Sequence, residues 1–383
     1  MKVLVVTNDF PPRPGGIQAF VHSLASRLDP DDVVVYASNW SGAADFDAAQ
    51  AFPVVRHPTS LMLPTPAVQR RAAALAREHD CDSVWFGAAA PLALLAAPLL
   101  RADGPIRRAV GSTHGHEVGW AMLPVARQLL HRIGSTTDVV TYLGDYTRRR
   151  LAPALGPSAT LAQLPSGVDS ALFHPGCGGD DIRKRHGLQD RPVVVCVSRL
   201  VPRKGQDVLI RAMPALRRRF PDLALLLVGG GPYRDALARL AREHGVERDV
   251  VLTGSVPWEE LPAHYDAGNV FSMPCRTRRR GLEVEGLGIV FLEANATGLP
   301  VVAGNSGGSP DAVREGETGL VVDGTDVGAV TNALVPLLED EELRRRMGAA
   351  GRAWVEQRWR WDVLAGRLRG ILDGTAEQPP ELT

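Results

Sequence analysis

The chain has 383 residues, of which 45% are apolar and 22% are charged, and its 43 lysines and arginines equal its 43 aspartates and glutamates. This length predicts about two domains, and the apolar content is ample for two buried cores. The balanced charge gives no overall indication of nucleic-acid binding, so we predict no nucleic-acid partner and look for recognition in local clusters.

Short β-branched runs alternate with helical stretches in the first half of the chain. The predicted strands are residues 2–6, 32–37, 83–87, 107–112 and 138–143. The predicted helices between them include 17–28, 66–79 and 122–132. This alternation is typical of a parallel sheet with crossover helices, so we predict a doubly wound, Rossmann-like α/β domain over 1–166.

The same rhythm begins again after residue 190. The predicted strands are 192–198, 223–229, 249–254, 269–274, 300–304 and 319–323. The predicted helices are 206–219, 233–244, 259–267, 287–298 and 326–338. We therefore predict a second Rossmann-like domain over 167–360, joined to the first by the turn-rich segment 165–181. Two such domains facing each other leave a cleft at the carboxyl ends of their strands, where ligands bind.

Cysteine spacing and the N-terminal segment indicate the compartment. Cys81, Cys177, Cys196 and Cys275 are irregularly spaced, which argues against a zinc site or a disulfide framework. The apolar start of the chain is too short for a signal peptide, and no run of about 18 apolar residues occurs. We therefore predict a soluble cytoplasmic protein that can lie on a membrane surface.

The segment "RLVPRKGQD" (199–207) follows a predicted strand and opens a predicted helix. Helix N-termini carry unpaired N–H groups and a partial positive charge, so Arg199 and Lys204 beside them suit a diphosphate. The alternative is a solvated loop with basic surface residues, because one helix terminus alone is not a specific signal.

A second segment, "GLEVEGLGIVFLEANATG" (281–298), places Glu285 before a predicted helix and Glu293 inside it. Carboxylates accept hydrogen bonds from hydroxyl groups, and a carboxylate within the apolar run "IVFLEANA" is costly unless it binds something. Gly286 and Gly288 let a ligand approach the N–H groups at the helix start. Together with the basic loop, this acidic pair predicts a nucleotide-sugar site.

Two loops of the first domain also follow predicted strands. The loop "NDFPPRPGGIQAF" contains Gly15 and Gly16, which permit close approach of a ligand, but it has no GxGxxG or GxxxxGK[ST] spacing. The alternative for this loop is a stiff turn. The loop "GSTHGHEVGW" contains His114, which can hydrogen-bond a sugar hydroxyl or can merely order the loop.

These motifs together resemble the retaining GT-B glycosyltransferases of family 4 over nearly the whole chain. The matching pieces are the Gly15–Gly16 loop, "SGVD" with the following "F.P" at 166–175, Arg199 with Lys204, "VGGGP" at 228–232, "EGLGIVFLE" at 285–293 and "GG.PD.V..G.TG.VV" at 307–322. The resemblance implies the GT-B fold, in which a last helix (about 361–383) returns to the first domain. It also implies sugar transfer with retention at the anomeric carbon.

The resemblance assigns roles to particular residues. Arg199 and Lys204 would hold the donor diphosphate, while Glu293 binds the ribose and Glu285 the donor sugar. The implied catalytic residues are His114, Arg199, Lys204 and Glu285. The implied donor-binding residues are Gly16, Arg199, Lys204, Ser255, Met273, Glu285, Gly286, Leu287, Gly288 and Glu293. The acceptor-side candidates are Asn8, Gln18, His116, Arg70 and Arg71, and His116 competes with His114 for the place beside the sugar.

A narrower resemblance concerns the substrates. "NDFPPRPGGIQ", "THGHEVGW" and "RTRRRGLEVEGLGI" are similar to segments of the actinobacterial phosphatidylinositol-monomannoside mannosyltransferases that use GDP-mannose. The resemblance implies a GDP-mannose donor, a lipid acceptor, and no cofactor or metal ion. The alternatives are a UDP- or ADP-linked donor with a soluble or polysaccharide acceptor, or a non-catalytic nucleotide-sugar-binding protein. Nothing in the sequence indicates an oligomeric state.

The segment "SLMLPTPAVQRRAAALAREH" bears on the acceptor. Leu61, Met62 and Leu63 precede Arg70 and Arg71, and an exposed apolar edge with arginines suits an anionic bilayer. The alternative is an amphipathic helix packed on its own sheet. The resemblance favours a peripheral protein on the inner face of the plasma membrane.

Overall fold

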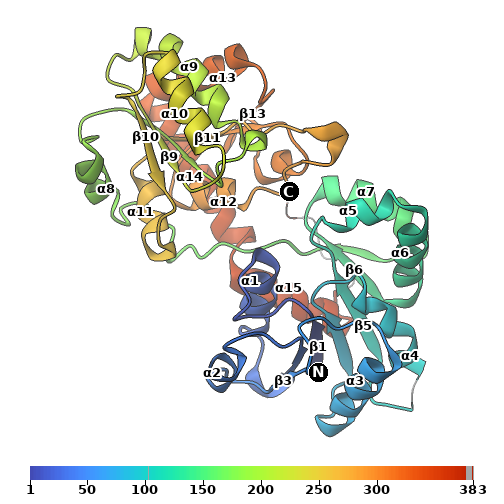
Figure 1. The fold of residues 1–383 in the computed structure, drawn as a ribbon. Coiled ribbons are helices and arrows are strands. Elements are labelled where there is room, and N and C mark those ends of the chain that lie inside the picture. The colour runs from blue at the N-terminus through green and yellow to red at the C-terminus, as the bar shows by residue number, and fades with distance from the viewer. Residues whose placement is uncertain (102, 377–381, 383) are drawn as a thin grey trace. The chain divides into compact units, whose positions relative to one another are not determined.

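The computed structural model describes residues 1–101, 103–376 and 382. The chain packs into two compact units, Met1–Gly167 with Trp361–Leu382 and Val168–Arg360 (Figure 1). Each unit contains a parallel sheet covered by helices, as the alternating sequence patterns predict. The doubly wound α/β class is therefore confirmed for both halves.

The sheet of the first unit consists of short strands rich in β-branched residues. Its described strands are β1 (Val3–Thr7), β2 (Val33–Ala37), β3 (Val54–Arg56), β4 (Ser83–Phe86), β5 (Arg108–Ser112), β6 (Val139–Tyr142) and β7 (Leu161–Gln163). They lie parallel in the order β3-β2-β1-β4-β5-β6-β7, so the chain winds outward from β1 first to one side and then to the other. Doubly wound sheets bind ligands beside such a reversal, at the carboxyl ends of the strands.

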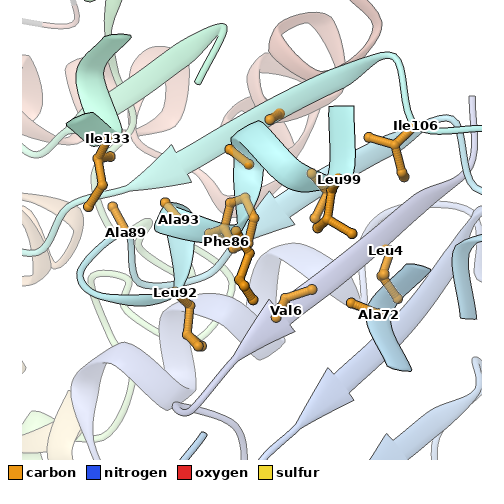
Figure 2. Close-up of a cluster of buried hydrophobic side chains, with 14 of the residues drawn as sticks. Leu4, Val6, Ala72, Phe86, Ala89, Leu92, Ala93, Leu99, Ile106 and Ile133 are labelled. Atoms are coloured by element: carbon orange, nitrogen blue, oxygen red, sulfur yellow. The ribbon is translucent and has the colours of Figure 1, made fainter. Parts of the chain in front are cut away.

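Helices cover both faces of this sheet. They are α1 (Gly16–Ala25), α2 (Ala43–Ala48), α3 (Pro66–Glu78), α4 (Ala96–Arg101), α5 (Glu117–Ala121), α6 (Pro124–Thr136), α7 (Asp145–Leu155) and α15 (Trp361–Asp373). Helix α15 packs on α1, β4 and β5, whereas α3 and α4 pack on each other and on the opposite face. Figure 2 shows the core of that opposite face, where Leu4, Val6 and Phe86 of the strands cluster with Ala72 of α3 and Ile133 of α6.

The second unit repeats this architecture. Its described strands are β8 (Val193–Val197), β9 (Ala224–Val228), β10 (Val250–Gly254), β11 (Val270–Met273), β12 (Val301–Gly304) and β13 (Gly319–Val322), parallel in the order β10-β9-β8-β11-β12-β13. Its helices are α8 (Gly179–His186), α9 (Gln206–Arg219), α10 (Arg234–Glu243), α11 (Leu261–Asp266), α12 (Ile289–Ala296), α13 (Val327–Glu339) and α14 (Glu341–Arg358). Helix α9 packs between α10 and α13, while α8 packs on α11 and α14 on α12.

Several elements differ from the predicted ones because their sequence signal is weak. The predicted helix 122–132 corresponds to α6, which begins at Pro124 because proline suits the first turn of a helix. The sequence does not predict the short helix α5 that precedes it. The sequence does not predict β3 and β7, since three residues are too few to show a strand pattern. The predicted connection 165–181 overlaps α8, which begins at Gly179.

Candidate functional site

A buried ion pair in the second unit joins the basic loop to the acidic loop. Lys204 Nζ lies 2.6 Å from Glu285 Oε2, and both side chains are buried. Arg203 Nη1 lies 3.0 Å from the same oxygen and donates to Val284 O at 3.2 Å. Charge-assisted hydrogen bonds of this kind are short and strong, so they fix the two loops to each other. The sequence predicts separate roles for Lys204 and Glu285, and nothing in it singles out Arg203.

The backbone around Lys204 is held by a glycine and a buried amide. Gly205 has φ 79°, and a Cβ built on it lies 1.9 Å from Pro274 O, so only glycine fits there. Gln206, at the first position of α9, donates to Ser198 Oγ at 2.9 Å and to Arg199 O at 3.1 Å. Lys204 and the exposed Arg199 therefore both lie at the carboxyl end of β8, beside the N-terminus of α9. Sequence reasoning missed the anchoring role of Gln206.

Glu293 lies inside α12, as the sequence analysis predicts, and its carboxyl group is buried. The hydroxyl group of Tyr265, which is also buried, donates to Glu293 Oε2 at 2.6 Å. Burial raises the pKa of Glu293 to about 7, and the hydrogen bond from Tyr265 offsets part of that rise. A carboxyl group with this pKa changes charge near neutral pH. Only its tertiary packing reveals the Tyr265 partner, which lies 28 residues away in the sequence.

Glycines control the loop that carries Glu285. A Cβ built on Gly307 lies 2.0 Å from Glu285 O, and a Cβ on Gly308 lies 2.2 Å from Gly286 O. Gly308 N also donates to Glu285 O at 2.9 Å, so the 307–308 pair grips the loop through its backbone. A Cβ on Gly286 meets nothing within 4 Å, which leaves open space beside the loop. Gly288 has φ 82° and forms the N-cap of α12.

The other predicted donor-binding residues of this unit differ in exposure. Ser255 follows β10 and is exposed. Met273 ends β11 with its side chain fully buried, and its carbonyl accepts a hydrogen bond from Cys275 N at 2.7 Å. Leu287 is also buried. A ligand at the surface of this unit can therefore contact the Ser255 side chain but not the side chain of Met273.

His114 is held in one orientation at the carboxyl end of β5. Its Nε2 lies 2.6 Å from Gly87 O, and its backbone N donates to Glu117 Oε2 at 3.0 Å. Because a carbonyl oxygen only accepts, Nε2 carries the proton and Nδ1 is the acceptor. Burial lowers the pKa of His114, although the Glu117 carboxylate opposes that fall, so the ring is neutral at pH 7. The exposed His116 lies 3.4 Å from Glu117 Oε1, so Glu117 supports both histidines.

The glycine loop of the first unit leads into α1. Gly16 is the first residue of that helix, and a Cβ built on it meets nothing within 4 Å. A Cβ on Gly15 would lie 2.1 Å from Gln18 Oε1. Gln18 is buried and donates from Nε2 to Asp9 Oδ1 at 2.8 Å. Gly15 therefore shapes the turn, and Gly16 leaves room above the start of the helix.

The acceptor-side candidates are not equivalent. Asn8 donates to Met62 O at 2.9 Å and accepts from Met62 N at 2.6 Å, so its amide fixes the loop after β3. The prediction that Met62 is exposed is wrong, because its side chain is fully buried and anchors this loop. Arg70 and Arg71 are exposed on α3, and Arg71 pairs with Glu78 at 3.0 Å. Among the residues that the structure describes, no helix is both long enough and apolar enough to cross a bilayer.

No triad of histidine, cysteine, aspartate or glutamate side chains suitable for a metal ion occurs within residues 1–101, 103–376 and 382. The described cysteines are all free thiols. Cys196 in β8 and Cys275 after β11 are buried, as is Cys81. Burial raises the pKa of Cys196 to about 12, so this thiol stays protonated and inert.

Two doubly wound units in one chain, with Lys204 after β8 paired to Glu285 on the loop before α12, form the fold of the GT-B class. Solved structures with this fold include HepE of Anabaena in complex with UDP (TM-score 0.79, 19% identity, 98% of this chain and 100% of that chain). They also include sucrose-phosphate synthase of Thermosynechococcus elongatus (TM-score 0.73, 22% identity, 98% and 100%).

The sequence comparisons assign the family. Residues 14–172 match the family model described as Glycosyltransferase Family 4, and residues 179–354 match that described as Glycosyl transferases group 1. The chain is 57% identical over 380 residues to the GDP-mannose-dependent alpha-(1-6)-phosphatidylinositol monomannoside mannosyltransferase of Mycolicibacterium smegmatis, covering 98% of this chain and 99% of that protein. It is 48% identical over 376 residues to the GDP-mannose-dependent monoacylated alpha-(1-6)-phosphatidylinositol monomannoside mannosyltransferase of Corynebacterium glutamicum, covering 97% of each. The chain belongs to glycosyltransferase family 4, and it is an enzyme that transfers a sugar.

Proposed function

We propose that this glycosyltransferase transfers mannose from GDP-mannose to a phosphatidylinositol mannoside and forms an α-linked product. The observation that carries the proposal is the 57% identity to the Mycolicibacterium smegmatis enzyme over 380 residues, which spans both units. Similarity to that enzyme in the second unit alone would support only the donor assignment, because the second unit is proposed to bind the donor. The similarity also includes the loops of the first unit, which is proposed to bind the acceptor.

The donor-side geometry supports a nucleotide sugar. Lys204 and Arg199 stand beside the N-terminus of α9, where two cations and backbone N–H groups suit a diphosphate. Glu285, 2.6 Å from Lys204, is placed for hydroxyl groups of the sugar attached to that diphosphate. Glu293 is assigned to the ribose on the other side. In this assignment one acid group binds the sugar and the other binds the ribose, with the diphosphate between them.

The reaction we propose is a displacement on one face of the donor sugar. The bond from the anomeric carbon to the diphosphate oxygen breaks, and an acceptor hydroxyl oxygen bonds to the same face. The hydroxyl proton passes to the departing diphosphate. Lys204 and Arg199 stabilise the negative charge on that group, so we propose that no resident metal ion is needed. We assign the neutral His114 to a place beside the reacting sugar, where it would add no charge near the cationic carbon.

The acceptor is proposed to be reached at a membrane surface, on the inner face of the plasma membrane. Leu61 is 56% exposed and Leu63 is 52% exposed on the loop that Asn8 and Met62 anchor. Met122 and Leu123, which follow α5, and Val125, in the first turn of α6, form a second exposed apolar segment. Single exposed apolar residues are ordinary, but grouped ones beside basic helices suit an anionic bilayer.

Two experiments test these proposals. In a thermal-shift screen, GDP is expected to raise the melting temperature where UDP and ADP do not, because a ligand that binds only the folded state stabilises it. With GDP-[¹⁴C]mannose and phosphatidylinositol mannoside, the enzyme is expected to form a labelled lipid that α-mannosidase digests. Preference for UDP or ADP, or labelling of polysaccharide alone, would favour the other donor or a soluble acceptor.

Membrane association has its own test, co-flotation with phosphatidylinositol-containing liposomes at low salt. Replacing Leu61 and Leu63 by serine should reduce the floated fraction, whereas Val363→Ser, at an exposed position of α15, should not. A wild-type chain that stays at the bottom of the gradient would refute the peripheral assignment.

A further inference from the structure

The first unit has a hollow of about 460 Å³ that the catalytic assignments do not use. Its lining residues are Asn39, Trp40, Ser41, Pro58 and Ser60. They follow β2 and β3 in the chain, so they stand at the carboxyl ends of parallel strands, the edge at which doubly wound sheets bind ligands. Its volume lies within the range of small-molecule sites.

The walls of this hollow are fixed by hydrogen bonds before any ligand arrives. Asn39 N donates to Thr59 O at 2.9 Å, which ties the loop after β2 to the loop after β3. Trp40 N donates to Asn39 Oδ1 at 2.9 Å, and Thr59 Oγ1 donates to Leu61 O at 2.7 Å. Below them, Arg56 donates to Ser38 O at 2.9 Å. A preformed site loses little conformational entropy on binding.

Trp40 gives the hollow an aromatic wall. Trp40 is 41% exposed, so a large apolar area of its ring faces water and is available to a ligand. The Arg13 guanidinium carbon lies 5.2 Å from the Trp40 ring centroid, so a positive charge stands next to the indole. Around them, Asn39, Ser41 and Ser60 offer amide and hydroxyl groups. An aromatic face, hydroxyl partners and one cation together suit a cyclic polyol that carries a phosphate.

The neighbouring loop indicates that this polyol is attached to a lipid. Ser60 lines the hollow, and the next residue, Leu61, is exposed, as is Leu63. The buried Met62 between them, held by Asn8, turns both leucines outward. A phosphorylated headgroup in the hollow would have its acyl chains beside these two leucines. A free polyol phosphate has no use for that apolar edge.

We propose that the Trp40 hollow binds the inositol phosphate part of the acceptor lipid, with its ring against the indole and its phosphate near Arg13. The inference rests on the proposed function, because it names a subsite for the acceptor of that reaction. Trp40 is thus a residue for acceptor recognition, separate from the donor residues of the second unit.

The kinetic test compares acceptor and donor constants. Trp40→Ala is expected to raise the KM for phosphatidylinositol mannoside about tenfold, as loss of a tryptophan anchor commonly does, and to leave the KM for GDP-mannose unchanged. Trp40→Phe, which keeps an aromatic face, should restore most of the acceptor affinity. Arg13→Gln should weaken the acceptor, whereas Arg150→Gln, which removes an arginine 5.6 Å from the Tyr146 ring in the same unit, should not. An unchanged acceptor KM in Trp40→Ala would overturn the inference.

A binding test separates this inference from the proposed function. In 5-fluorotryptophan-labelled full-length protein, the ¹⁹F resonance of Trp40, assigned from Trp40→Phe, should shift with myo-inositol 1-phosphate and much less with inorganic phosphate or inositol alone. A Trp40 resonance that moves equally with inorganic phosphate, or not at all, overturns the subsite. If wild type transfers no mannose to the lipid but the resonance still shifts, the proposed function fails while the subsite stands.

Discussion

With Glu293 at the ribose as proposed, its raised pKa predicts that donor affinity depends on pH. Burial raises this pKa from an ordinary value of 4.5 to about 7. If ribose hydroxyls donate to the carboxylate, donor binding needs the ionised form, whose population increases as pH rises through 7. We therefore expect GDP-mannose to bind more tightly at pH 8 than at pH 6.

The size of the effect follows from the ionised fraction. With a pKa of about 7, Glu293 is roughly one-tenth ionised at pH 6 and roughly nine-tenths ionised at pH 8. An affinity that depends on a competent form is reduced by the fraction of protein in that form. The dissociation constant for GDP-mannose should therefore fall about tenfold from pH 6 to pH 8.

The same carboxyl group should make the ligand-free protein respond to pH in the opposite direction. Its folded-state pKa is above the unfolded value, so the folded state binds more protons between pH 4.5 and 7 and the free energy of unfolding falls as pH rises through that window. The loss is about 3 kcal/mol, from a shift of about 2.5 units at 1.36 kcal/mol each. Glu293→Gln cannot ionise and so does not show this loss. The free energy of unfolding of the variant minus that of wild type should therefore be larger at pH 8 than at pH 5.

Isothermal titration calorimetry with GDP-mannose measures the affinity from pH 6 to pH 8. Both phosphates of this donor are esterified, so it lacks the second phosphate ionisation near pH 6 that would complicate GDP. Glu293→Gln should flatten the pH profile, while Glu243→Gln, at an exposed position that ends α10, should keep it. A wild-type profile that is flat within twofold, or one that Glu293→Gln retains, would refute the role of Glu293.

Three further predictions test neighbouring parts of the site. Tyr265→Phe removes a hydrogen bond that lowers the Glu293 pKa, so the midpoint of the donor-affinity profile should move to higher pH, and a move to lower pH would contradict the assignment. Lys204→Ala should reduce turnover by roughly 10²- to 10³-fold, as loss of a charge-stabilising donor does, with an unchanged circular dichroism spectrum; turnover within threefold of wild type would remove the diphosphate role. Gly307→Ala places a Cβ 2.0 Å from Glu285 O at φ 59°, so it should lower both the melting temperature and donor affinity, whereas Gly286→Ala, which meets nothing within 4 Å, should keep the melting temperature. Equal melting temperatures for the two glycine variants would show that the close backbone contact of Gly307 and Gly308 with the Glu285 loop does not stabilise the fold.

The fold could be predicted from the sequence where a strand is long enough to show its pattern. The core "VVVCV" of the predicted strand 192–198 is apolar throughout and forms β8, because a strand buried on both faces of a parallel sheet has no polar side. The sequence does not predict helix α7, because the polar start "DYTRRR" hides the helical spacing of its apolar residues. The start of this helix is fixed instead by Thr147, whose hydroxyl group accepts from Gly144 N and donates to Gly144 O. Such local hydrogen bonds leave little trace in composition.

The site could be predicted as a set of residue types but not as a set of contacts. The sequence indicated Lys204 and Glu285 from their places at strand and helix ends, and Glu293 from its place inside an apolar helix. It could not indicate that Lys204 meets Glu285, because 81 residues separate them and only the packing of two loops brings them to 2.6 Å. The Met62 error has a similar cause. Leu61, Met62 and Leu63 are all apolar and look alike in sequence. The side chain of Asn8 donates to the backbone carbonyl of Met62 and accepts from its N–H, and these bonds hold Met62 in place so that its side chain is buried.

The contact between Lys204 and Glu285 also bears on how the donor is recognised. Two buried charges taken out of water are stable only when each compensates the other, so removal of either partner leaves a costly unpaired charge. In the proposed complex, the negative diphosphate pairs with Lys204, and the sugar hydroxyl groups donate hydrogen bonds to Glu285. Arg203, 3.0 Å from the same carboxylate oxygen, then keeps Glu285 neutralised while Lys204 turns toward phosphate. In this proposal the pair links recognition of the sugar to recognition of the leaving group, so a nucleotide without its sugar would compensate the charge of Lys204 but leave Glu285 without its sugar hydroxyls.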